Sequence, residues 1–300
     1  MTQTIAITGA TGTLGRPLAE ALLDRGDRVI ALVRDPAAAN LPPAVEVRRW
    51  TASDPAAPLD GADAVVNLAG APIAARRWTA ARRRAITASR VDGTRSVVAG
   101  MARAGSVRAL VSASAIEYSG ARGEAGFDET TPPGAGFLPE LTRAWEEAAE
   151  RALALGARVV LLRKGVVLAP AGGMLATLLP FFQRGLGVTL GSGRQWLPWL
   201  HLADDIGLML LALDRDDVRG PLVCAAPNPV RFRAFARTLG QVLGRPPRLR
   251  VPTWALRLAL GETAQVVTAS HRPQVGRALG LGYEFRFPLL GAALADLVGE

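Results

Sequence analysis

The stretch that decides the fold is Thr8-Gly9-Ala10-Thr11-Gly12-Thr13-Leu14-Gly15. A short apolar run, residues 4–7, precedes it, and a helix-like pattern over residues 16–25 follows it. This order predicts a β-strand, a glycine-rich turn and an α-helix. The first amides of a helix are unpaired and lie at the positive end of its dipole, so such a turn can bind a pyrophosphate.

The three glycines of this turn have separate predicted roles. We expect Gly9 to make the tight turn, Gly12 to let the backbone approach the phosphates, and Gly15 to let helix and strand pack closely. The residues predicted to surround the pyrophosphate of a dinucleotide are Gly9, Thr11, Gly12, Thr13 and Leu14.

A second apolar strand, residues 28–33, ends where dinucleotide-binding proteins select their coenzyme. Its last residue, Val33, offers no acid for the ribose hydroxyls of NAD. Arg34 follows directly, and a guanidinium at this place would bind the 2′-phosphate of NADP in a bidentate manner. Asp35 leaves an alternative open, because its carboxylate could turn back toward the ribose instead of beginning a turn with Pro36. We therefore predict NADP(H), with NAD as the alternative.

The composition is that of a compact protein without a membrane span. The chain has 300 residues, of which 49% are apolar. No apolar run approaches the roughly 20 residues of a membrane span, and the first predicted strand leaves no room for a signal peptide. The single cysteine, Cys224, excludes an intramolecular disulfide and a thiolate metal cluster, and we expect it to be buried. These features predict a cytoplasmic protein without a metal site or a membrane partner.

The net charge of +9 comes mainly from arginines spread along the chain. Lys164 is the only lysine among 35 basic residues, and the one dense cluster is Arg76-Arg77-Trp78 with Arg82-Arg83-Arg84. Because charge runs usually form a solvated helix face, we expect no nucleic-acid partner, although this cluster leaves that alternative open. A site for an anionic cofactor or substrate accounts for part of the excess charge.

Short apolar strands alternate with helical patterns in the first half of the chain, which predicts an α/β fold with a parallel sheet. The predicted strands are 4–8, 28–33, 45–49, 64–68, 109–112 and 158–162, and the longest predicted helices are 80–104 and 137–155. We predict a Rossmann-type doubly wound sheet in residues 1–168, with 200–228 returning to it. Residues 169–199 and 229–300 are predicted to form a smaller, partly interleaved C-terminal lobe over the substrate. A homo-oligomer is left open.

A series of short motifs resembles the extended short-chain dehydrogenase/reductase superfamily. Besides the glycine turn, these motifs include Val65-Val66-Asn67-Leu68-Ala69-Gly70, Ser89-Arg90, Ser112-Ala113-Ser114-Ala115, Leu162-Arg163-Lys164-Gly165-Val166-Val167-Leu168, Trp199-Leu200-His201 and Leu260-Gly261-Glu262. Their order, over essentially the whole chain, is similar to that of an atypical branch, the epimerase family proteins, whose C-terminal lobe is a domain of unknown function.

The resemblance implies further cofactor contacts. Leu68, Ala69 and Gly70 resemble the loop that lines the adenine-ribose and diphosphate side of the cofactor. Arg90 stands where many extended members have an asparagine that faces the cofactor, and a solvated arginine is the alternative. Val167 would contact the nicotinamide end through its backbone.

The same resemblance reveals a break in the catalytic signature. Hydride-transferring members use a Tyr-x-x-x-Lys pair as acid and base, with a serine that orients the substrate carbonyl. In this chain Leu141 and Trp145 stand at these two places, and neither tyrosine lies four residues before the lysine. Ser114 occupies the serine position, and Tyr118 could replace the missing acid.

Two further groups of residues have competing interpretations. His201, Asp204 and Asp205 could form a His/Asp set. We favour the alternative, in which an acid caps the start of a helix and His201 lies at the end of the preceding strand. Trp196 and Trp199 could form the wall of an aromatic pocket or lie in the core of the lobe.

These features together predict an NADP(H)-dependent oxidoreductase or epimerase-like enzyme that acts on a small carbonyl or hydroxyl substrate. Ser114 and Tyr118 are its candidate catalytic residues. The alternative is a regulatory or scaffold protein that keeps the cofactor pocket without hydride chemistry, because the Tyr/Lys pair is missing. No motif identifies the substrate.

Overall fold

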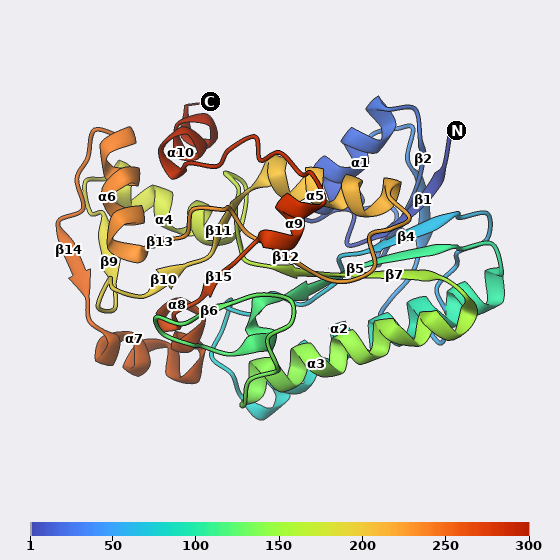
Figure 1. Ribbon diagram of the computed structural model, residues 1–300, viewed down its shortest axis with the longest axis horizontal. Helices are drawn as coiled ribbons and strands as arrows, with labels where there is room; N and C mark the ends of the chain where they lie inside the picture. The colour runs from blue at the N-terminus through green and yellow to red at the C-terminus, as the bar shows by residue number, and fades with distance from the viewer. Residues whose placement is uncertain (1, 300) are drawn as a thin grey trace.

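The computed structural model describes residues 2–299, and its centre is a parallel sheet of seven strands (Figure 1). The strand order is β12-β7-β5-β4-β1-β2-β3, and all neighbours are parallel. The strands are β1 (Thr4–Thr8), β2 (Arg28–Val33), β3 (Glu46–Arg49), β4 (Ala64–Asn67), β5 (Ala109–Ala115), β7 (Arg158–Lys164) and β12 (Gly220–Cys224). This order confirms the predicted Rossmann-type α/β fold.

Helices cover both faces of the sheet, which explains why its strands are almost continuously apolar. The main helices are α1 (Gly15–Asp24) and α5 (Leu202–Asp214) on one face, and α2 (Ala80–Ala104) and α3 (Phe137–Glu150) on the other (Figure 1). Successive side chains of a strand point to opposite faces. Ile5 and Ile7 of β1 therefore join the core with α1 and α5, and Ala6 joins the core with α2.

A smaller lobe has its own apolar core, in which Phe182, Phe235 and Trp199 are fully buried. Trp199 therefore lies in the core of the lobe and does not form the wall of a pocket. The lobe contains α4 (Gly173–Gln183), α6 (Phe232–Val242), α7 (Thr253–Leu260), α8 (Gln265–Thr268), α10 (Leu290–Val298), and the strand pairs β9 (Val188–Leu190) with β14 (Leu249–Val251) and β10 (Trp196–Leu197) with β13 (Val230–Arg231).

The start of α5 differs from the prediction that an acid caps this helix. The N-cap is His201, whose Nδ1 accepts the Ala203 N–H at 3.0 Å. Asp204 is fully buried and accepts the amides of Arg286 and Phe287 at 2.7 and 3.0 Å. Asp204 therefore fixes a distant segment of the chain instead of capping its own helix.

The outer edge of β12 is closed by side chains. Glu129 Oε1 accepts the Val223 N–H at 2.8 Å, and the Arg277 guanidinium donates to the carbonyls of Pro221 and Arg219. Backbone groups that are paired in this way are not available to a strand of another chain.

Cys224, the last residue of β12, is buried, as predicted. Burial raises the pKa of its thiol, so the residue is protonated at neutral pH. Within residues 2–299, no helix is both long enough and apolar enough to cross a membrane.

Candidate functional site

The glycine turn between β1 and α1 is closely packed. Gly9 has a φ of +71°, and a Cβ on it would lie 3.1 Å from the carbonyl of Leu68. A Cβ on Gly15 would lie only 2.2 Å from the Gly9 carbonyl oxygen. The Gly12 N–H donates to that same oxygen at 3.0 Å. Glycine is therefore required at Gly9 and Gly15, and the backbone of the turn is open to a close approach.

This turn presents unpaired amides at the start of α1. Leu14 is the N-cap, and its side chain makes no capping hydrogen bond. The N–H groups of Thr11, Thr13 and Leu14 have no acceptor among residues 2–299. Three unpaired donors beside a helix N-terminus fit a pyrophosphate, so these residues could hold the phosphates of a dinucleotide.

The end of β2 separates the two candidate coenzyme-selecting residues. Asp35 Oδ1 accepts the Ala37 N–H at 3.1 Å, so its carboxylate closes the turn that follows the strand. Arg34 is exposed and its guanidinium has no acceptor within the described part of the chain. The geometry therefore favours Arg34 over Asp35 as the group that is free to meet a ligand.

The loop after β4 is fixed beside the glycine turn by Thr8. The Thr8 hydroxyl donates to Asn67 Oδ1 at 2.7 Å and accepts the amides of Leu68 and Ala69 at 3.0 and 3.1 Å. The predicted cofactor loop, Leu68 to Gly70, therefore lies next to the glycine turn.

Arg90, on α2, covers the end of this loop. Its Nη1 donates to the Ala71 carbonyl at 3.0 Å, and a Cβ on Gly70 would lie 3.2 Å from the guanidinium carbon. The guanidinium lies 5.2 Å from the centre of the Trp145 ring. Burial lowers the pKa of Arg90 to about 10, so the side chain is still charged at neutral pH. The side chain is half-buried and hydrogen-bonded to the loop, and its predicted contact with the cofactor stays a prediction.

Val167 lies in the short strand β8 (Val166–Leu168), which pairs with β11 (Trp199–His201). The segment that follows β8 approaches the glycine turn, because a Cβ on Gly172 would lie 2.1 Å from Thr13 Oγ1. The structure thus brings the predicted nicotinamide-side segment and the predicted phosphate-side turn to one edge of the sheet.

The two positions at which hydride-transferring members have the Tyr/Lys pair lie in an apolar core of this chain. Leu141 and Trp145 are 5% and 6% exposed and pack in a cluster with Trp78, Ile86 and Leu138. Trp145 Nε1 donates to Thr94 Oγ1 at 3.0 Å, so its polar atom is also satisfied. Neither position offers an acid or a base.

Ser114 lies in a buried ionic network. Its hydroxyl donates to Glu146 Oε1 at 2.5 Å, and Arg163 holds the same carboxylate through Nε at 2.9 Å and Nη2 at 2.8 Å. The Arg163 guanidinium also lies 3.6 Å from the centre of the Tyr118 ring. The two predicted catalytic residues, Ser114 and Tyr118, are therefore brought together around the Arg163–Glu146 ion pair.

This network determines what Ser114 can do chemically. The one proton of the hydroxyl is donated to Glu146, which leaves the lone pairs of Oγ for another group. Ser114 is thus arranged to accept a hydrogen bond from a ligand hydroxyl. The sequence analysis did not identify Glu146 as a site residue. Glu146 directly follows Trp145, but the sequence alone does not show which face of α3 its carboxylate lies on.

Lys164 does not belong to this network. Its Nζ pairs with Asp205 Oδ1 at 2.5 Å, and both side chains are buried. Asp205 comes from α5, whereas Glu146 comes from α3, so Lys164 and Arg163 of β7 point to opposite faces of the sheet. The one lysine of the chain therefore does not replace the missing catalytic lysine.

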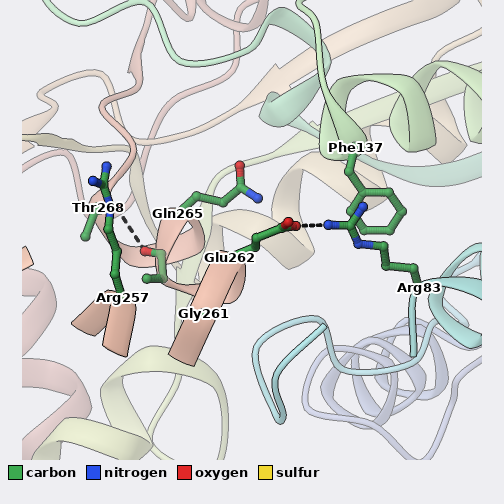
Figure 2. A pocket seen from close by; sticks show the side chains of 8 residues that line it. Arg83, Phe137, Arg257, Gly261, Glu262, Gln265 and Thr268 are labelled. Atoms are coloured by element: carbon green, nitrogen blue, oxygen red, sulfur yellow. Dashed lines mark hydrogen bonds and ion pairs between the residues drawn. The ribbon is translucent and has the colours of Figure 1, made fainter. Parts of the chain in front are cut away.

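A cleft of 680 Å³ lies between the lobe and the amino ends of α2 and α3. Figure 2 shows Arg83 between the ring of Phe137 and the carboxylate of Glu262, with Gln265 and Arg257 across the cleft. Its size suits a small-molecule ligand.

Two arginines of the cluster seen in the sequence, Arg77 and Arg83, contact the lobe. Arg77 donates to the carbonyls of Leu258 and Ala259 in α7, and Arg83 pairs with Glu262. These two side chains are therefore engaged within the molecule.

Two family models match the chain. Residues 5–224 match the NAD dependent epimerase/dehydratase family, and residues 251–297 match a domain of unknown function, DUF1731. The chain belongs to the epimerase/dehydratase family. The resemblance expected from the sequence motifs is thereby confirmed, including the C-terminal domain of unknown function.

Relatives of known sequence cover almost the whole chain. An epimerase family protein of Mycobacterium bovis, Mb2239, is 38% identical over 295 residues, which are 97% of this chain and 96% of that protein. The chloroplastic SDR39U1 homolog of Arabidopsis thaliana is 38% identical over 98% of this chain and 86% of its own. The crystal structure of human epimerase family protein SDR39U1 with NADPH matches with a TM-score of 0.90, 31% identity and 99% coverage of both chains.

Proposed function

We propose that this chain binds NADP(H) and acts as an oxidoreductase or epimerase-like enzyme on a small carbonyl or hydroxyl substrate. The observation that carries the proposal is the coenzyme-selecting end of β2, where Arg34 is free while Asp35 is occupied by its own turn. The unpaired amides of the glycine turn fit the pyrophosphate of the same ligand. The NADPH in the structure of the human relative supports this choice of coenzyme.

The chain's own residues would then have separate roles. A bound nicotinamide would supply or accept the hydride. Ser114, whose proton is donated to Glu146, would accept a hydrogen bond from a substrate hydroxyl. Tyr118 would carry the proton, directly or through water, because its hydroxyl has no acceptor within residues 2–299. The cleft beside Phe137 would take the rest of the substrate.

A survey of small alcohols with NADP⁺, and of aldehydes and ketones with NADPH in the reverse direction, tests this proposal. We expect hydride transfer with at least one compound, and a loss of about 100-fold in its rate in Ser114→Ala. Ser119→Ala is a matched control, because the Ser119 hydroxyl is buried without a partner and its removal should change little. Unchanged activity in Ser114→Ala would exclude Ser114 from the mechanism.

A regulatory or scaffold role is the second candidate. The observation that favours it is the burial of Leu141 and Trp145 in an apolar core at the places of the catalytic pair. Stoichiometric binding of NADPH without turnover of any compound would support this role. Steady turnover would reject it.

A further inference from the structure

The smaller lobe carries positive charge that its own acids do not balance. Residues 169–199 and 229–260 contain nine arginines and neither aspartate nor glutamate. Eight of these arginines are exposed. Within the described part of the chain only one of the nine forms an ion pair, Arg231 with Glu124, and that carboxylate comes from outside the two segments. This part of the lobe is therefore strongly basic toward solvent.

The same two segments expose large apolar side chains. Six of the ten large apolar side chains that are exposed among residues 2–299 lie in them. The two most exposed are Trp254 at 69% and Leu258 at 72%, which lie one turn apart on α7. The other four are Phe181, Leu186, Val242 and Leu249. Exposed apolar side chains that cluster in this way mark a binding surface.

Three stretches of chain bring these side chains together. The Leu186 N–H donates to the Phe181 carbonyl at 2.8 Å, which closes the turn after α4. The Gly187 carbonyl accepts the amides of Arg248 and Leu249 at 3.0 and 3.1 Å, and β14 continues beside β9. α7 begins two residues after β14, and Figure 1 shows α4, β9, β14 and α7 at the same end of the molecule. We call this end the lobe surface, and it consists of residues 181–187, 245–250 and 254–258.

The composition of the lobe surface fits an anionic lipid bilayer. Arginines are attracted to anionic headgroups, and apolar side chains beside them can enter the boundary between headgroups and acyl chains. A tryptophan ring prefers this boundary, because one edge of it is polar and the rest is apolar. The lobe surface thus combines the two kinds of side chain that peripheral membrane binding requires.

Two other occupants fit the lobe surface less well. A symmetric dimer through it would set the same unpaired arginines of two copies against each other. Single-stranded nucleic acid stacks its bases on aromatic rings, whereas four of the six exposed apolar side chains are aliphatic. Leucine and valine gain more from acyl chains than from a polar nucleic-acid backbone.

We infer that the lobe surface docks this protein on an anionic lipid bilayer, with Trp254 and Leu258 entering the headgroup boundary and Arg245 and Arg248 meeting the headgroups. The prediction of no membrane partner rested on the lack of a spanning apolar run, which does not concern binding at the surface of a bilayer. The docking is independent of the proposed coenzyme and reaction, because the glycine turn and Ser114 belong to the sheet.

Co-sedimentation of the full chain with lipid vesicles tests the inference. One set of vesicles contains phosphatidylcholine alone, and the other contains phosphatidylcholine with anionic phosphatidylglycerol. We expect binding to the anionic vesicles only, and a fall in affinity as the salt concentration rises.

Variants of the lobe surface separate charge from apolar insertion. Arg245→Gln and Arg248→Gln should each lower the affinity for anionic vesicles by about fivefold, and the double variant by about 25-fold. Trp254→Gln and Leu258→Gln leave the net charge unchanged and should each lower this affinity by about tenfold. These four side chains are exposed, so the fold should not depend on them.

Matched controls come from the rest of the molecule. The double variant Arg103→Gln with Arg108→Gln removes the same charge at exposed positions outside the lobe. Leu153→Gln replaces a leucine that is 56% exposed between α3 and β7. Both controls should bind anionic vesicles like the unmutated chain.

The outcomes decide between this inference and the alternatives. Equal losses in the lobe variants and their controls would mean that net charge alone causes binding, and would overturn the role of the lobe surface. Unchanged binding by Trp254→Gln and Leu258→Gln would overturn the apolar insertion. Failure to bind anionic vesicles at low salt overturns the whole inference, and binding of poly(U) RNA in its place, weakened by the arginine variants, would assign the surface to nucleic acid.

Discussion

Ser114 and Glu146 share a 2.5 Å hydrogen bond although they lie 32 positions apart in the sequence. The bond joins the carboxyl end of β5 to the middle of α3, and Arg163 of β7 closes the other side of the carboxylate. Glu146 thus connects the candidate serine, the neighbouring strand and the helix.

Removal of Glu146 should destabilise the protein strongly. Glu146→Ala leaves the Arg163 guanidinium, 5% exposed, without its carboxylate, and breaking a buried pair from one side costs about 3–5 kcal/mol. Urea unfolding measures the change. Glu147→Ala is the control, because that side chain is 63% exposed and its loss should have little effect. Similar stabilities of the two variants would contradict the account of this network.

The contact between Gly15 and Gly9 should tolerate no added methyl group. A Cβ on Gly15 would lie 2.2 Å from the Gly9 oxygen, so Gly15→Ala should shift the turn, destabilise the fold by about 1–3 kcal/mol and weaken NADPH binding. Gly291→Ala meets nothing within 4 Å in α10 and should be neutral or stabilising. Thermal unfolding and NADPH titration of both variants test this, and a Gly15→Ala protein with unchanged affinity would refute it.

Opening the edge of β12 should promote self-association. Glu129→Ala frees the Val223 N–H, and Arg277→Ala frees the carbonyls of Pro221 and Arg219. Unpaired edge groups recruit strands of other molecules. Light scattering during incubation at elevated temperature should show faster aggregation of the double variant. Aggregation at the rate of the unmutated chain would mean that these side chains do not protect the edge.

His201 should make stability depend on pH below neutrality. Burial lowers the pKa of His201 from 6.5, while Asp296 and Asp204 raise it and Arg286 lowers it. The unfolded state then binds the proton more readily than the folded state. The stabilisation of the fold by the neutral imidazole is therefore complete above pH 6.5 and is lost as the pH falls below it.

The variant His201→Asn isolates this effect, because asparagine does not titrate and is a good N-cap. The free energy of unfolding should fall less between pH 7 and pH 5 in the variant than in the unmutated chain. A pH dependence that is equal in both, or steeper in the variant, would contradict the lowered pKa of His201.

Local sequence signals predicted most of the fold. The glycine turn, β1, β2 and α2 have the predicted bounds or nearly so, because glycine spacing and apolar periodicity are properties of neighbouring residues. The predicted strand 109–112 was too short, since β5 continues to Ala115 through small residues that carry no strong strand preference.

The reaction centre was less predictable because it depends on contacts between distant segments. Ser114, Glu146 and Arg163 come from β5, α3 and β7, and no local pattern says that they meet. Aspartate is a common capping residue and histidine is not, so the sequence favoured an acid; the Asp204 carboxylate instead binds the distant amides of Arg286 and Phe287, and His201 caps the helix. The predicted catalytic and cofactor roles themselves stay predictions.

We expect Arg34 to select the coenzyme, and calorimetry with NADPH and NADH measures this selection. A charge-assisted bond to phosphate contributes about 1.5–3 kcal/mol, so NADPH should bind about tenfold to about a hundredfold more tightly than NADH. Arg34→Ala should remove most of this difference and leave NADH affinity nearly unchanged. Arg28→Ala, at the opposite end of β2, should retain it. Equal affinities in the unmutated chain, or a preference for NADH, would contradict the account.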